Sequence, residues 1–184
     1  MMRPIILILL FSLSLSNSLR AQEEEDKPHR RANYTQHTIK VASPLDSIVV
    51  YKAERRMDVY HKKLHVKTYI ICLGLEPEGN KNFEGDLRTP EGLYYINDRS
   101  RKSAYHANLG VSYPNLSDSL MARVYGRSPG GEIKLHGFPN KHRKDQEWDI
   151  LNDDWTLGCI AVSDNEIDEL YEWVVMYCPI MIKP

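Results

Sequence analysis

Cysteine is scarce in this chain, and its copies are widely separated. Of 184 residues only three are cysteine, at Cys72, Cys159 and Cys178, and no two of them form a Cys-x-x-Cys pair. A disulfide framework or a cysteine-rich zinc site is therefore poorly supported. Because the number is odd, at least one thiol stays free, and the spacing does not decide whether Cys72 and Cys178 form a disulfide.

An excess of positive charge is also missing, as are internal repeats and a glycine-rich phosphate-binding loop. The chain carries 24 lysines and arginines against 25 aspartates and glutamates. A balance of this kind does not attract a polyanion, so we expect no nucleic-acid partner.

The amino terminus lacks an apolar run long enough to cross a bilayer. Arg3 precedes an apolar stretch at residues 5–15 that only serines interrupt, and Ala21 follows shortly after it, whereas a membrane span needs about 20 apolar residues. The pattern predicts a signal peptide over residues 1–21, with an uncleaved anchor as the alternative. Residues 22–45 are charged and predict a flexible leader. We therefore expect an exported chain with one folded domain over residues 46–184.

Within that domain, short runs of β-branched and aromatic residues predict strands at 47–52, 65–74 and 93–98, with a further strand and turn between the first two. Residues 76–92 predict a long loop, and residues 119–126 a short helix. Ser163 and Glu166 form a capping box ahead of a helix with an apolar stripe, and a final strand follows it. Strands and helices do not alternate regularly, which predicts a β-rich α+β fold with few helices.

The segment Gly-Gly-Glu-Ile-Lys-Leu-His-Gly alternates apolar and polar residues, which predicts a strand that carries His136 on its polar face beside Gly137. Cys159 follows Gly158 and precedes a short apolar run. A cysteine nucleophile needs a base and donors for the oxyanion; a neighbouring imidazolium would hold its thiolate, and the amides around Gly158 and Cys159 are candidate donors. Equally, Cys159 could be a core cysteine and His136 a structural histidine.

Other side chains offer alternatives for the same roles. His106 and His142 are alternative bases; His142 lies in a basic segment where we expect exposure to solvent. Trp155 is a candidate for the floor of a pocket, although core packing is the commoner role of tryptophan.

Four segments in order, GDLRTPEGLYYI, YPN, GGEIKLHG and WTLGCIAVSDNEIDELY, resemble the L,D-transpeptidase catalytic domain family, and most of all its branch with a Trp-Thr-x-Gly-Cys-Ile-Ala motif. These cysteine enzymes remodel bacterial peptidoglycan. The resemblance implies an L,D-transpeptidase-like mixed β-sandwich or barrel. It implies Cys159 as nucleophile and His136 as base, without metal or organic cofactor. The residues that would shape the site are Gly137, Thr156, Gly158, Trp155, His106 and Arg88.

One position departs from the family pattern. Many members carry an arginine two positions after the cysteine, where this chain has Ala161, so another cation, at Arg88, Arg123 or Lys134, is a candidate to contact a substrate carboxylate.

The resemblance implies an exported enzyme of the periplasm or cell envelope that acts on peptidoglycan stem peptides through a thioester. The thioester would pass to an amine or to water, and a murein-bound lipoprotein is a further candidate partner. We expect cleavage at least as much as cross-linking. The alternatives are a non-catalytic wall-binding module and a zinc hydrolase using His106, His136 and Cys159. The oligomeric state is left open.

Overall fold

The described part of the chain folds around a curled sheet of eight strands. The computed structural model describes residues 44–142 and 147–184. The strands are β1 (Ser47–Tyr51), β2 (Arg56–His61), β3 (Leu64–Ile70), β4 (Gly92–Ser100), β5 (Asn108–Val111), β6 (Lys134–His136), β7 (Ile160–Ala161) and β8 (Pro179–Lys183). The helices are α2 (Leu116–Val124), α3 (Glu147–Asn152) and α4 (Asp164–Trp173). The predicted β-rich α+β fold is therefore confirmed.

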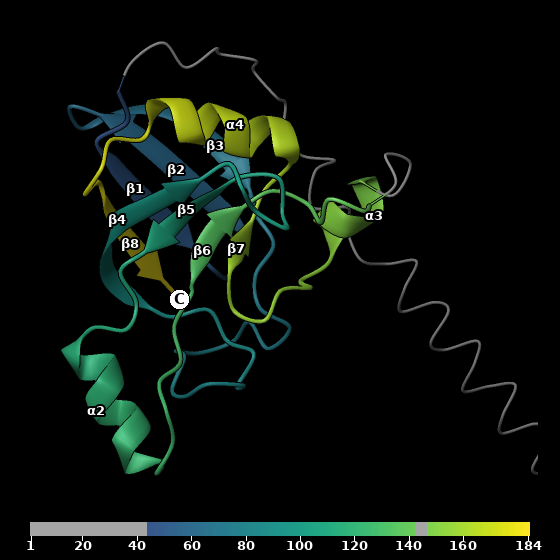
Figure 1. Ribbon diagram of the computed structural model, residues 1–184. Helices are drawn as coiled ribbons and strands as arrows, with labels where there is room; N and C mark the ends of the chain where they lie inside the picture. The colour runs from purple at the N-terminus through teal and green to yellow at the C-terminus, as the bar shows by residue number, and fades with distance from the viewer. Residues whose placement is uncertain (1–43, 143–146) are drawn as a thin grey trace, which may run out of the picture. The chain divides into compact units, whose positions relative to one another are not determined.

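The strand order is β3-β2-β1-β8-β4-β5-β6-β7. Neighbouring strands run antiparallel except for two parallel pairs, β1 with β8 and β6 with β7. Figure 1 shows α4 lying across the sheet, while α2 stands apart from it at the lower edge of the domain. None of the helices in the described residues is long and apolar enough to cross a membrane.

The register of β5, β6 and β7 determines which side chains meet at the end of the sheet. Leu135 pairs with Leu109 on one side and with Ile160 on the other, and all three are fully buried. Because side chains alternate between the two faces of a strand, the neighbours of Leu135 point to the opposite face. The predicted alternation of this strand is therefore correct, and it places His136 on the same face as Lys134.

Helix α4 begins as the sequence predicts. Ser163 donates its backbone amide to Glu166 Oε2 at 2.9 Å and its hydroxyl to the same oxygen at 2.6 Å, so two polar groups at the helix start are satisfied. Ile167 and Leu170 are fully buried against the sheet. The predicted final strand is observed as β8.

Two local predictions need correction, and one helix was missed. The strand expected over residues 65–74 ends at Ile70, because Ile71 donates to the Arg55 carbonyl and Cys72 then bridges to Ala161 on the far side of the sheet. The helix expected from residue 119 begins at Leu116, where Asn115 and Asp118 form an unrecognised capping box. The short helix α3 was not predicted.

The long loop before β4 is confirmed, and a buried lysine fastens it to the sheet. The Lys52 ammonium, 2% exposed, donates to the carbonyl oxygens of Gly79 and Thr89 and to Glu91 Oε1, at 2.5, 3.0 and 2.8 Å. Burial lowers the pKa of Lys52, but these acceptors compensate its charge. The loop is therefore held against β1 at several points along its length.

Candidate active site

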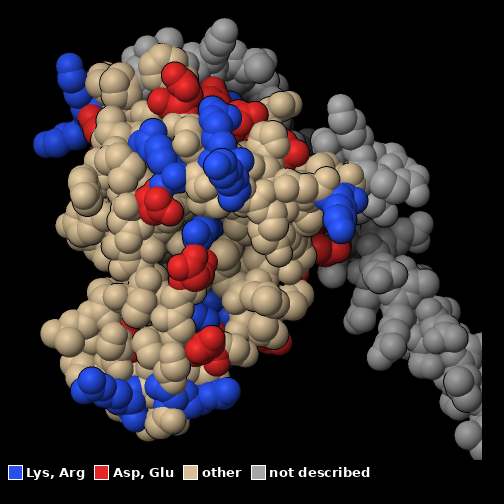
Figure 2. Space-filling model, in the orientation of Figure 1, with Lys and Arg blue, Asp and Glu red and all other residues tan. Residues whose placement is uncertain are grey.

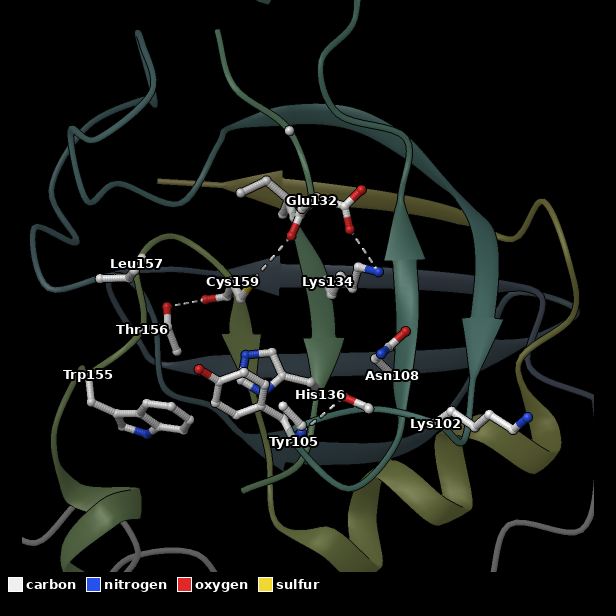
Figure 3. A pocket seen from close by; sticks show the side chains of 14 residues that line it. Lys102, Tyr105, Asn108, Glu132, Lys134, His136, Trp155, Thr156, Leu157 and Cys159 are labelled. Atoms are coloured by element: carbon white, nitrogen blue, oxygen red, sulfur yellow. Dashed lines mark hydrogen bonds and ion pairs between the residues drawn. The ribbon is translucent and has the colours of Figure 1, made fainter. Parts of the chain in front are cut away.

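A cleft of about 520 Å³ lies over the ends of β5, β6 and β7. Figure 3 shows that its lining side chains come from β5, from β6 and from the segments just before β5, β6 and β7. Those used below are Tyr105, Asn108, Lys134, His136, Trp155 and Cys159. The structure thus brings together four of the predicted site residues, Cys159, His136, Trp155 and Thr156.

Cys159 is half-buried at the entrance of β7. Its thiol donates to the carbonyl oxygen of Glu132 at 3.5 Å, so the sulfur lies against the start of β6. Burial raises the pKa of the Cys159 thiol, and this outweighs the opposite effects of the Lys134 backbone amide and of its ammonium group. At neutral pH the free protein therefore holds a protonated thiol in the cleft.

A threonine fixes the backbone that presents this thiol. The Thr156 hydroxyl donates to the carbonyl of Cys159 at 2.7 Å and accepts from the amide of Gly158 at 3.1 Å. The Gly158 amide is therefore already used, and it does not serve as the expected oxyanion donor. Gly158 has φ of 132°, and a Cβ atom there would lie 2.7 Å from the Arg88 carbonyl oxygen, so only glycine fits this position.

His136 is the imidazole on the same face of the sheet. Its Nδ1 lies 2.7 Å from the carbonyl oxygen of Gly137, which can only accept, so Nδ1 carries the hydrogen and Nε2 has the free lone pair. Figure 3 shows the opposite edge of the ring directed towards Cys159. The ring packs at 4.6 Å from Tyr105 and at 5.6 Å from Trp155, between centroids. These two aromatic rings leave His136 only 5% exposed.

The same burial sets the protonation state of the histidine. It lowers the pKa of His136, and the bond to Gly137 offsets only part of this effect. The imidazole is therefore neutral at pH 7, in contrast to the imidazolium expected from the sequence. A neutral imidazole beside a neutral thiol is suited to accept the thiol proton during attack on a carbonyl group.

Gly137 allows the strand to pass close to α4. A Cβ atom at this position would lie 2.5 Å from Asp164 Oδ1 and 3.0 Å from His106. The same Asp164 oxygen accepts the amide of Phe138 at 2.8 Å. The first turn of α4 therefore anchors the chain directly after His136.

The other predicted residues lie elsewhere. His106 Nε2 pairs with Asp168 on α4 at 2.9 Å. His142 is half-buried, with Nδ1 2.8 Å from the carbonyl of Pro139, so the expected solvent exposure is only partial. The Arg88 side chain lines a second hollow beside Phe83 and not the cleft, although its backbone carbonyl contacts Gly158.

A zinc site receives no support from this arrangement. Within residues 44–142 and 147–184, no three His, Cys, Asp or Glu side chains gather in a way that could hold a metal ion. His106, the third ligand of that alternative, is paired with Asp168.

The three cysteines are all free thiols. Cys72 is fully buried and donates to the Ile150 carbonyl at 3.2 Å. Cys178 is 1% exposed, and burial raises its pKa to about 12. The pairing of Cys72 with Cys178 that the sequence left open is therefore not formed.

The two ends of the cleft differ in character. Trp155 and Leu157 make one end apolar, whereas Lys134 and Lys102 place cations at the other. Of the three cations considered as a carboxylate contact, Lys134 is the one that lines the cleft; Arg123 lies exposed on α2. Lys134 pairs with the largely exposed Glu132 at 2.9 Å.

Tyr105 and Asn108 are site residues that the sequence did not reveal. Asn108 pairs with His136 across β5 and β6 and is 6% exposed, yet its Oδ1 has no hydrogen-bond partner. The Trp155 indole Nε1 is likewise buried without an acceptor. One acceptor and one donor behind the cleft wall are therefore buried without a protein partner. Asn108 could have been predicted from its position opposite His136 on the neighbouring strand, but only if the strand register had been known.

Residues 46–182 match the family model of the YkuD L,D-transpeptidase catalytic domain. Because the match covers most of the chain, the chain belongs to this family. The cleft with its thiol and imidazole lies within the matched region.

Relatives of known name agree with the assignment. The candidate L,D-transpeptidase YafK of Escherichia coli (strain K12) is 27% identical over 133 residues, which are 69% of this chain and 46% of YafK. The helical cell shape determining protein Pgp2 of Campylobacter jejuni matches in structure with a TM-score of 0.60 and 25% identity, over 77% of this chain and 48% of Pgp2.

Bd1075 of Bdellovibrio bacteriovorus shares the fold, with a TM-score of 0.53 and 24% identity, over 77% of this chain and 49% of Bd1075. The chain spans about half the length of each of these relatives.

The protonation states predict how the thiols react. We expect iodoacetamide to label Cys159 and neither buried cysteine in the native protein, at a rate that rises with pH to beyond the usual thiol pKa of about 8.5. The label is located by mass spectrometry after proteolysis. Cys159→Ser should lose the label and the matched Cys178→Ser should keep it. A half-maximal rate below pH 8 would contradict a raised thiol pKa.

Proposed function

We propose that this chain is an exported cysteine enzyme that acts on the stem peptides of peptidoglycan. The observation that carries the proposal is the neutral thiol of Cys159 and the free Nε2 of His136 on one face of the sheet, in a cleft open to substrate. Membership of the L,D-transpeptidase catalytic domain family supports the reaction class. The description of Pgp2 as a cell shape determining protein supports the cell wall as the place of action.

In the first step the sulfur of Cys159 attacks a carbonyl carbon of the stem peptide while His136 Nε2 accepts the thiol proton. The resulting imidazolium then gives this proton to the leaving amine, and a thioester remains. Burial of both groups favours this route, because it avoids a standing thiolate–imidazolium pair in the free enzyme.

In the second step an amine or water attacks the thioester and gives its proton to His136 Nε2, the C–S bond breaks, and the Cys159 sulfur takes that proton back. An amine gives a cross-link, whereas water leaves a shortened stem; a peptide attached through an amine, such as the end of a murein-bound lipoprotein, would already have left in the first step. The rim of the cleft is open, with Leu157 72% exposed and the Glu132 side chain 87% exposed. Water can therefore reach the sulfur, and we expect cleavage at least as much as transfer.

Substrate recognition falls to the polar end of the cleft. Lys134 lies level with Cys159 in the register of β6 and β7, so its ammonium would meet a carboxylate on the residue at the scissile bond.

A non-catalytic wall-binding module is the second candidate function. It would keep the cleft but would not need a thiol and an imidazole with free Nε2 in it. The presence of both groups argues for the enzyme.

Substitution of the reacting groups should separate these two functions. Cys159→Ala should abolish turnover of muropeptides, and His136→Gln should slow it about 10²- to 10⁴-fold, as expected for loss of a general base. The matched variants Cys178→Ala and His106→Gln should keep turnover, apart from any loss of folded protein seen in thermal unfolding. Substantial turnover by Cys159→Ala would exclude the thioester mechanism.

Lys134 should determine recognition of a carboxylate. We expect Lys134→Met to lower kcat/KM about 10-fold, mainly through KM, because one charge-assisted hydrogen bond is lost. The loss should disappear with a stem peptide whose carboxylate at this residue is amidated. Arg88→Met, whose side chain lies outside the cleft, is the control. An equal loss with both substrates would assign the carboxylate contact to another residue.

The balance between water and amine can be read from products. We expect tetrapeptide muropeptides to yield shortened stems, and muropeptides with a lysine-linked peptide remnant to release it, when products are separated by mass. The Cys159→Ala protein provides the blank. Abundant new dimers without shortened stems or released remnant would show that transfer dominates.

A further inference from the structure

Helix α2 exposes most of its apolar side chains to solvent, which is the reverse of the usual pattern of a surface helix. Its buried residues are Asp118 and Ala122. Its outer face consists of exposed apolar side chains, at Leu116, Leu120, Met121, Val124 and Tyr125, which are 76, 52, 43, 80 and 52% exposed. Surface helices normally bury their apolar stripe, so an exposed one indicates that something else covers it.

The inner face explains how the helix keeps this orientation. The carboxylate of Asp118 accepts from the Tyr94 hydroxyl at 3.0 Å and from the Asn115 amide at 2.8 Å. Turning Asp118 outward would break these hydrogen bonds and leave the buried Tyr94 hydroxyl with only the more distant Glu91 carbonyl oxygen, at 3.3 Å. The outer face of α2 is therefore held towards solvent by hydrogen bonds and does not fold back onto the sheet.

The exposed charged side chains of residues 115–127 are all positive. Arg123 and Arg127 are exposed, and residues 115–127, all of which the structure describes, expose no carboxylate. Figure 2 shows Lys and Arg side chains gathered along the tip of the lobe that contains α2. An anionic partner complements this surface.

The shape of the outer face distinguishes between partners. At about 100° per residue, its apolar side chains cover about half of the helix circumference. A helix that binds in a protein groove needs only a narrow stripe of anchors, whereas a helix lying in a lipid interface is apolar on its whole outer side with arginines at the edge. A second copy of this chain would bring the arginines of both copies together.

We propose that the outer face of α2 binds the surface of an anionic lipid bilayer. Leu120 and Val124 enter the interface while Arg123 and Arg127 contact the lipid headgroups. The chain runs from α2 directly to Glu132 and Lys134 in the cleft wall, so binding would hold the cleft close to the membrane. This inference goes beyond the proposed function and does not depend on the reaction.

The test is binding of the full chain to vesicles of phosphatidylglycerol and phosphatidylethanolamine, with phosphatidylcholine vesicles as the neutral comparison. We expect Leu120→Ser with Val124→Ser to weaken binding about 100-fold and Arg123→Gln about five-fold. Matched controls are the exposed Leu64→Ser and Lys63→Gln on the β2–β3 hairpin. Turnover of soluble muropeptides should be unchanged in all of these variants, which separates this result from failure of the proposed function.

Residues 5–15 are apolar and common to all variants, so a local measurement is also needed. Hydrogen–deuterium exchange should slow in residues 116–127 when anionic vesicles are added. Unchanged exchange there would overturn the proposal, even if the chain as a whole bound to vesicles. Equal affinity for neutral vesicles would also overturn it. So would a concentration-dependent dimer that Leu120→Ser with Val124→Ser abolishes, because the face would then bind a second copy.

Discussion

The candidate site depends on the two hydrogen bonds made by the Thr156 hydroxyl group. It binds the Gly158 amide and the Cys159 carbonyl while Thr156 itself is 3% exposed, so water cannot replace either bond, and each unpaired group would cost about 1–3 kcal/mol. The backbone of Thr156 also bonds to Leu73 and Leu75. The long loop before β4 and the cysteine turn are thereby joined into one unit, and the position of the sulfur follows from it.

Burial, more than pairing of opposite charges, sets the chemistry of this site. The aromatic rings beside His136 and the backbone around Cys159 both disfavour the charged forms of these groups. The site therefore holds a protonated sulfur and an imidazole with one unprotonated nitrogen. The hydrogen bond from Nδ1 to the Gly137 carbonyl oxygen determines that Nε2 is the unprotonated nitrogen. Gly137 can accept this hydrogen bond because α4 packs directly against its Cα.

Local sequence patterns predicted most strands and the α4 capping box, and the family motif placed Cys159 and His136 in one site, where both line the same cleft. These features depend on neighbouring residues or on a motif. The stacking of Tyr105 on His136 and the position of Asn108 depend on strand register, which hydrophobic alternation alone does not specify. The outer face of α2 was missed for another reason: an apolar helix stripe normally predicts burial, whereas here Asp118 holds the opposite face inward.

The alanine at position 161 follows from local packing. Ala161 is fully buried and belongs to an apolar cluster with Cys72, Phe138 and Leu151. An arginine here would bring an unpaired charge into that cluster, so the cation of the cleft must come from another strand. Lys134 provides this cation. In the register of β6 and β7 it corresponds to Cys159, whereas Ala161 corresponds to His136. Its charge favours the thiolate; in the proposed mechanism a bound substrate carboxylate would cancel that effect, and His136 would remove the thiol proton during attack.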